Sequence, residues 1–147
     1  MLKKKSSGFT LIEILLVLTT IGVLAAIIIP VSGFFYNRNN LDLAVKQVVS
    51  DWRRAQSLAR GAEADSNWGV YITSTSSVTF KGSSYISRDS AYDESENLNS
   101  LGSVSGLTEV VFYKATGTPI TNGTIILNSI NNESKNVSIN SQGTISY

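Results

Sequence analysis

The sequence predicts an α+β chain, in which a long N-terminal helix is followed by a C-terminal head made of antiparallel strands. Three observations support this prediction. Residues 9–31 form an almost uninterrupted apolar run, residues 41–62 place apolar side chains at helical spacing, and the residues after Asn67 mix β-branched side chains with Ser, Thr, Asn and Gly. At 147 residues, the chain has room for one domain with an appendage but not for two full cores.

The first half of the predicted helix is the apolar run at residues 9–31, whose one charged residue is Glu13. As a helix, this run would be about 35 Å long at ~1.5 Å per residue, which is enough to cross a hydrocarbon core of about 30 Å. The run is preceded by Lys3, Lys4 and Lys5. By the positive-inside rule, these lysines place the N-terminus in the cytoplasm and the head outside. We therefore interpret residues 9–31 as a transmembrane segment.

Two simpler interpretations of this segment explain less of it. A cleaved secretory signal has a shorter apolar core that ends in small residues, whereas Ala25 and Ala26 lead here into three isoleucines and Pro30. A plain anchor explains the length and the lysines but not Glu13, because a carboxylate within the membrane costs about 2.5 kcal/mol or more when it is unpaired. In a plain anchor, Glu13 would have to snorkel to the headgroups.

Gly22 and Pro30 interrupt the apolar run. Proline removes a backbone donor and clashes with the preceding turn, so we expect a helix kink between Ala26 and Pro30. Gly22 weakens the helix before that point. The other interpretation is that both residues are merely tolerated, as they often are in membrane helices.

The second half of the helix, residues 32–62, is amphipathic outside the membrane. One apolar stripe advances by four and three residues in turn, which predicts a helix docked on a following sheet. The stripe consists of Leu41, Val45, Val48, Trp52, Ala55, Ala59 and Ala62. We expect the helix to end at Gly61 or within residues 65–67. Arg53 and Arg54 could contact phosphates, but a solvated helix face explains them more simply.

The head, residues 63–147, is expected to be rich in short strands. Residues 68–73 and 78–81 are predicted to form a hairpin, and residues 141–143 are predicted to turn the last two strands into another. We expect residues 88–106 to be a polar loop, because they contain little apolar material. The predicted strands cover residues 68–73, 78–81, 84–86, 109–113, 123–127, 136–139 and 144–147.

Composition excludes several kinds of chemistry. The chain contains no Cys and no His, so a disulfide, a zinc–thiolate site and a Ser-His-Asp triad are impossible. No catalytic motif is present, and we expect neither an enzyme nor a cofactor. The formal net charge of +1 argues against a protein that coats nucleic acid. Carboxylates between residues 89 and 96 could bind Ca²⁺, but they lack EF-hand spacing and are better explained as a solvated loop, so no metal is expected.

Residues 5–13, which read Lys-Ser-Ser-Gly-Phe-Thr-Leu-Ile-Glu, and the apolar run behind them resemble the class III signal of type IV pilins and type II secretion pseudopilins. The resemblance implies that a prepilin peptidase cuts after Gly8, that residues 1–8 are a leader peptide, and that Phe9 is then N-methylated. Because a buried anion needs a partner, we expect the Glu13 carboxylate of one subunit to pair with the Phe9 ammonium of the next and to set the axial stagger of a filament. In this family, the stretch between Gly22 and Pro30 would unwind on assembly.

The order of helix and head is similar to that of the GspH/FimT class of minor pseudopilins. This likeness rests on the passage into Trp68, on residues 112–117 and on the terminal hairpin at residues 137–145. It implies a non-enzymatic minor pseudopilin of a type II secretion system or a type IV pilus assembly. Such a subunit spans the bacterial inner membrane once, with its head outside, before it joins a filament.

The partners implied by the resemblance are the prepilin peptidase and N-methyltransferase, other pilins or pseudopilins, and membrane lipid. No small-molecule substrate is implied, and nucleic acid is not expected as a partner. The alternative function is that of a minor pilin at a pilus tip, acting in DNA uptake or in adhesion to a surface. A membrane-anchored extracytoplasmic enzyme is a third and weaker alternative.

Overall fold

The structure is a computed structural model that describes residues 8–98 and 101–147, with the side chains of all of these except residues 27–38. The predicted α+β class is confirmed, because one long helix precedes two antiparallel sheets. The chain divides into two compact units, Met1–Tyr36 and Asn37–Tyr147. The predictions for Lys3, Lys4 and Lys5 fall outside the described residues.

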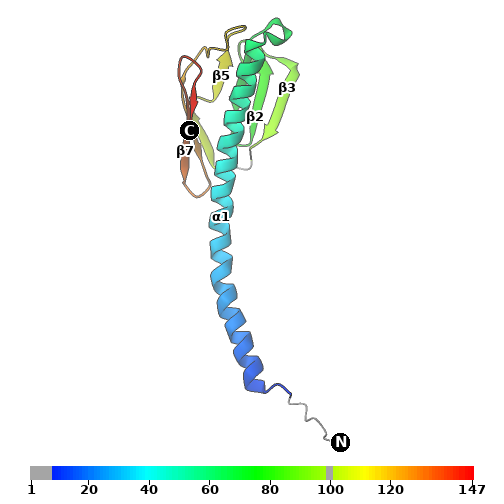
Figure 1. Cartoon of the computed structure of the whole chain (residues 1–147), viewed down its shortest axis with the longest axis vertical. Helices are drawn as coiled ribbons and strands as arrows, with labels where there is room; N and C mark the ends of the chain where they lie inside the picture. The colour runs from blue at the N-terminus through cyan, green and yellow to red at the C-terminus, as the bar shows by residue number, and fades with distance from the viewer. Residues whose placement is uncertain (1–7, 99–100) are drawn as a thin grey trace, which may run out of the picture. The chain divides into compact units, whose positions relative to one another are not determined.

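Helix α1 covers Leu11–Arg60, and its backbone remains helical through Gly22 and Pro30 (Figure 1). The kink expected before Pro30 and the unwinding expected on assembly stay predictions. Over the residues that the structure describes, no helix combines the length and the apolar character needed to span a membrane.

The helix ends at Arg60, next to Gly61, which was one of the two expected ends. The Ala59 carbonyl accepts hydrogen bonds from Ala62 N at 3.0 Å and from Ala115 N at 2.7 Å, so a loop of the head helps to close the last turn. Ala62 has a left-handed backbone (φ 49°) and leads into the short 3₁₀ helix η1, Glu63–Asp65. Its assignment to the apolar stripe was therefore wrong, and the buried stripe stops at Ala59.

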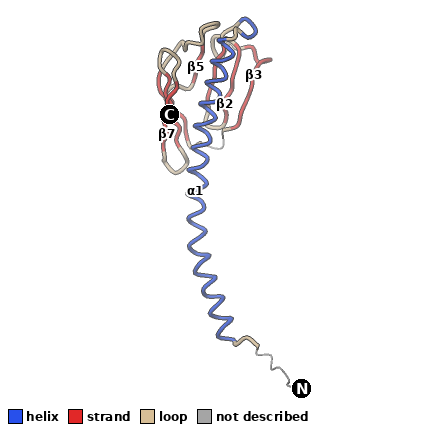
Figure 2. Tube along the Cα trace, in the orientation of Figure 1, coloured by secondary structure: helices blue, strands red, loops and turns tan. Residues whose placement is uncertain are grey.

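Two four-stranded antiparallel sheets make up the head (Figures 1 and 2). The strand order is β3-β2-β1-β5 in the first sheet and β4-β6-β7-β8 in the second. The predicted hairpins are confirmed, since β1 pairs with β2 and β7 pairs with β8, both antiparallel. The strands are β1 (Trp68–Ile72), β2 (Ser76–Lys81), β3 (Asp89–Asn97), β4 (Ser103–Gly106), β5 (Glu109–Phe112), β6 (Gly123–Asn128), β7 (Ser134–Ile139) and β8 (Ile145–Ser146).

The predictions for residues 84–86 and 88–106 were wrong. Residues 84–86 form no strand, and the supposed polar loop contains β3 and β4. Strand β3 shows no apolar alternation because none of its side chains is fully buried. Its backbone pairs along the edge of β2, so main-chain hydrogen bonds rather than hydrophobic burial define this strand.

The core lies between residues 41–59 of α1 and one face of each sheet. The predicted stripe supplies the helix side, and Trp52 is its largest fully buried side chain. Alternate residues of the strands supply the other side, among them Val70 and Val110 of the first sheet and Ile125 and Val137 of the second. Such alternation is expected of sheets that have one buried face.

A buried amide on α1 connects the helix to both sheets. Gln56 is 8% exposed, and its Nε2 donates hydrogen bonds to the carbonyls of Gly117 at 3.0 Å and Gly143 at 3.1 Å. Gly117 follows β5 of the first sheet, and Gly143 lies between β7 and β8 of the second. Both glycines have positive φ (65° and 81°), and a Cβ on Gly143 would lie 2.2 Å from the Gln56 amide nitrogen. Only glycine therefore allows this close approach.

The core also contains a carboxyl group, that of Asp51, which is 6% exposed. Its Oδ1 accepts a hydrogen bond from Gln47 Nε2 at 2.9 Å, whereas its Oδ2 is buried without a partner among the described residues. Desolvation raises the pKa of Asp51 from its ordinary 3.8. The polar groups of Ser77 and Gln47 oppose this shift, while the charges of Glu96 and Glu94 add to it.

We predict that Gln56→Leu destabilises the head. The substitution removes two hydrogen bonds and leaves two buried carbonyls unsatisfied, which should lower the free energy of unfolding by about 2–4 kcal/mol. Thermal or denaturant unfolding of the full chain measures this change. Gln142→Leu, at an exposed glutamine, is the matched control and should alter stability by less than about 0.5 kcal/mol. Equal effects of the two variants would contradict the proposed role of Gln56.

We also predict that Asp51→Asn stabilises the protein at neutral pH. Because the folded pKa is raised, the folded chain holds a proton that the unfolded chain has already released. The Asp51 contribution to stability therefore falls as pH rises from 3.8 through the raised pKa. Asparagine carries no charge and can still accept the Gln47 hydrogen bond. The denaturant midpoint should fall less between acidic and neutral pH in the variant than in the wild-type chain. The same dependence of the midpoint on pH in both proteins would contradict this prediction.

Candidate functional site

The residues that carry the resemblance lie at the start of α1, where Thr10 caps the helix. The Glu13 backbone nitrogen donates to Thr10 O at 3.1 Å and to Thr10 Oγ1 at 3.3 Å. A threonine followed three residues later by a glutamate is the sequence signature of a capping box. Glu13 also lies in the first turn, where the helix dipole favours an anion. Sequence reasoning missed this local role of Thr10, although its spacing to Glu13 could have shown it.

Gly8 and Phe9 precede the helix and are exposed. A Cβ built on Gly8 would meet no other atom of the described chain within 4 Å, and its backbone does not require glycine. The fold of this chain therefore does not explain why residue 8 is glycine. A requirement imposed by another molecule that approaches the backbone closely would explain it.

The first unit exposes many apolar side chains between Phe9 and Leu24. A contiguous exposed apolar surface indicates contact with lipid or with another protein. Gly22 lies among these residues, and a Cβ there would also meet nothing within 4 Å. The exposed apolar side chains are Phe9, Leu11, Ile12, Ile14, Leu15, Leu16, Val17, Leu18, Ile21, Val23 and Leu24.

The polar side chains within this surface differ in whether they have a hydrogen-bond or ion-pair partner within the described chain. Thr19 Oγ1 donates to the Leu16 carbonyl at 2.9 Å, and Thr20 Oγ1 donates to the Val17 carbonyl at 2.8 Å. These internal hydrogen bonds make both threonines compatible with an apolar environment. Glu13 forms no ion pair with any residue in the described part of the chain. Its carboxylate is therefore the polar group here that most needs an external partner.

Three of the carboxylates considered for Ca²⁺, those of Asp89, Asp93 and Glu94, are paired with cations instead. Asp89 lies 3.4 Å from Lys81 Nζ, Asp93 lies 2.8 Å from Arg88 Nε, and Glu94 binds the Arg54 guanidinium through both oxygens. The Arg54 hydrogen bonds hold the pKa of Glu94 below its ordinary value. Within residues 8–98 and 101–147, no three metal-ligating side chains come together. Arg54, which could have contacted phosphate, fastens α1 to β3.

The comparison with protein families matches the start of the chain. Residues 3–29 match the family model of the prokaryotic N-terminal methylation motif. No curated protein and no solved structure matches the chain. The motif supports a type IV pilin-like protein that is processed by a prepilin peptidase and assembles with other pilins, and proteins of this kind are typically structural subunits.

Proposed function

We propose that this chain is a non-enzymatic subunit of a pilin-like filament, namely a minor pseudopilin of a type II secretion system or a type IV pilus assembly. Residues 9–31 would hold it in the inner membrane until cleavage after Gly8 and N-methylation of Phe9. The observation that carries the proposal is a capped helix that begins just after an exposed Gly8-Phe9 pair and exposes apolar side chains around one carboxylate. This segment lies within the matched methylation motif.

The geometry at the helix start suits processing. Cleavage after Gly8 removes the three lysines and creates an ammonium group on Phe9, one residue before the Thr10 cap. The cap uses the backbone nitrogen of Glu13 rather than its side chain, so the carboxylate stays available to a neighbour. In a filament, this carboxylate would pair with the Phe9 ammonium of the next subunit. A charge that is costly in lipid would thus become a paired charge in the assembly.

The exposed apolar side chains provide the driving force for residence in the membrane and for assembly. Lipid would cover them before assembly, and the corresponding helices of neighbouring subunits would cover them afterwards. The space around Gly22 would let a neighbouring helix approach closely. The minor-subunit assignment is supported by the order of a long helix and a β-rich head, which resembles the GspH/FimT class.

We predict that the mature chain begins at Phe9 and carries one additional methyl group on its amine. Mass spectrometry of the N-terminal peptide from the native membrane tests this directly. Gly8→Val should block cleavage without affecting the fold, because a side chain at residue 8 meets nothing in the chain. Gly22→Ala, at an equally open glycine, should leave cleavage intact. An intact Met1 in the wild-type chain, or cleavage after Ala26, would contradict the proposal.

We further predict that Glu13→Leu abolishes assembly while processing and the head remain intact. Removing one member of a buried ion pair costs about 3–5 kcal/mol, which should reduce the filament fraction by at least about tenfold. The measurement is the amount of chain recovered in sheared or sedimented filaments, with proteolysis of the head as a test of folding. Glu133→Leu, at an exposed carboxylate of the head, is the control. Normal filament yield from Glu13→Leu would refute the role of the carboxylate.

A further inference from the structure

The turn between β6 and β7, residues 129–133, lies at one end of the head, and we call it the β6–β7 turn. Lys135, near the start of β7, forms an ion pair with Asp42 of α1. Gly143, in the turn after β7, accepts a hydrogen bond from Gln56, which lies further along the helix. Strand β7 therefore runs in the same direction as α1, and the β6–β7 turn that precedes it points back along the helix, toward its N-terminal side.

The length of the chain limits the distance between this turn and the proposed membrane segment. Asp42 follows Val31, the last residue of that segment, by eleven residues, which is at most about 16 Å along a helix at ~1.5 Å per residue. From Lys135, the three residues back to Asn132 extend about 10 Å in the opposite direction, at ~3.3 Å per residue. About 6 Å remain, which lies within the polar layer of about 5–8 Å on each side of the hydrocarbon core. The β6–β7 turn can therefore reach the lipid headgroups.

The backbone of the turn is held in place, and its tip is apolar. Ser129 N donates to the Glu133 carbonyl at 2.8 Å, and Asn132 N donates to the Ser129 carbonyl at 3.1 Å. Asn132 has a left-handed backbone (φ 61°), which asparagine tolerates better than most residues. Ile130 is 65% exposed. Single exposed isoleucines are common on protein surfaces, so the weight of the argument lies on the position of this one and on the cavity beside it.

A cavity of about 540 Å³ opens beside Ile130, and no ionisable side chain lines it. Its walls carry hydroxyl and amide groups that orient one another. Asn128 Nδ2 donates to Ser103 Oγ at 3.0 Å, and Ser134 Oγ donates to Asn128 Oδ1 at 2.8 Å. Within the described part of the chain, the Asn132 side chain forms no hydrogen bond. The amide of Asn132 can therefore donate to, and accept from, a molecule in the cavity.

Neutral hydroxyl and amide groups suit a ligand that carries many polar atoms and no net charge. The phosphate of a zwitterionic phospholipid accepts hydrogen bonds from such groups, and an ammonium donates to their oxygens. An anion would find no cation in the cavity wall, and Lys135 is paired with Asp42. Glu133, the one charged residue of the turn, attracts an ammonium and repels an anion. A zwitterionic headgroup is therefore the class of ligand that fits.

We propose that the β6–β7 turn docks on the membrane that holds the chain before assembly, with Ile130 at the acyl boundary and a zwitterionic phospholipid headgroup in the cavity. The contact rests on the proposed membrane segment at residues 9–31. One isoleucine binds lipid weakly by itself, but the membrane segment holds the turn at high effective concentration beside the bilayer. The contact orients the head before assembly and is released when the subunit leaves the membrane.

Quenching of a fluorophore by lipid tests the contact in the full chain, reconstituted into vesicles of phosphatidylethanolamine and phosphatidylcholine. Because the chain has no cysteine, Asn131→Cys places one small label on the turn and leaves Ile130 unchanged. Lipids with a nitroxide on the headgroup should quench this label several-fold more strongly than a label at the opposite end of the head. Ile130→Ser in the same background should reduce the quenching by about three- to tenfold.

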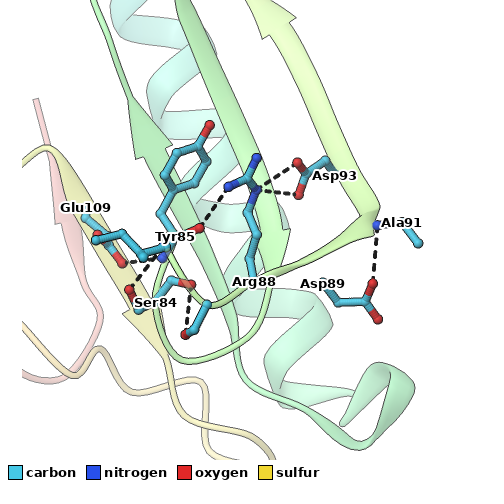
Figure 3. Close-up of polar contacts among 9 residues, drawn as sticks. Ser84, Tyr85, Arg88, Asp89, Ala91, Asp93 and Glu109 are labelled. Carbon is cyan, nitrogen blue, oxygen red and sulfur yellow. Dashed lines mark hydrogen bonds and ion pairs between the residues drawn. The ribbon is translucent and has the colours of Figure 1, made fainter.

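The opposite end of the head provides the matched controls. The loop at residues 83–88 follows β2, which ends beside the first residue of β1, just beyond the end of α1. Figure 3 shows the polar contacts of Tyr85 and Arg88 that hold this loop. Ser87→Cys carries the control label. Ile86→Ser, at an isoleucine that is 95% exposed, should leave the quenching of the turn label unchanged.

Two further measurements test the chemistry of the cavity. Asn132→Gly removes the amide and suits the left-handed backbone, so it should reduce the quenching by about two- to fivefold. Asn122→Gly, at an exposed asparagine just before β6, is its control and should have no effect. Replacing half of the lipid with anionic phosphatidylglycerol should not increase the quenching. Quenching that requires anionic lipid and falls as salt is added would show a contact through cations and overturn the proposed headgroup.

The remaining outcomes separate this proposal from its rivals. Equal quenching of labels at Asn131 and Ser87, or no effect of Ile130→Ser, would overturn the docking. A turn label that lipid does not quench, but that cross-links to another pilin in the native membrane, would show a subunit contact instead. Alkaline extraction of the same vesicles separates failure of the docking from failure of the proposed function. A chain that is washed out contradicts the membrane segment, whereas an embedded chain without quenching contradicts the docking alone.

Discussion

The head depends on one buried amide that belongs to neither sheet. Gln56 donates to carbonyls in two turns, and each turn follows a strand of a different sheet. Both carbonyls would be buried without a donor if the amide were absent, and both turns need glycine to come so close to the helix. The two sheets share no strand. Through this amide and the apolar stripe, both sheets are attached to the same helix.

The parts of the fold that bury apolar side chains could be predicted from the sequence. The stripe from Leu41 to Ala59 repeats at the helical period, and the β1–β2 hairpin and the last hairpin combine β-branched or aromatic residues with turn residues between the strands. Strand β3 could not be predicted, because its edge position leaves it almost no apolar signal and its pairing is made by the backbone. Gln56 could not be predicted either, since its partners lie 61 and 87 residues away in the sequence.

The candidate site was predictable for the opposite reason. Its residues are contiguous, and the motif is defined by their order in the sequence rather than by contacts across the fold. Gly8 and Glu13 have few internal contacts that could explain them, as the open space around Gly8 shows. The structure adds the Thr10 cap, which fixes where the helix starts relative to Phe9. Sequence order alone suffices here because the partner that recognises this segment is another molecule.

The charged side chains of this chain fall into two groups, those that form ion pairs between elements of the fold and those that do not. Those that form ion pairs in the described chain connect one element to another, as Arg54 connects α1 to β3 and Lys135 connects β7 to α1. Glu13 contributes no such connection in the described chain. Unpaired exposed charges cost a protein little in water. For Glu13, the proposed partner is the Phe9 ammonium of the next subunit, so its charge would become paired only after assembly.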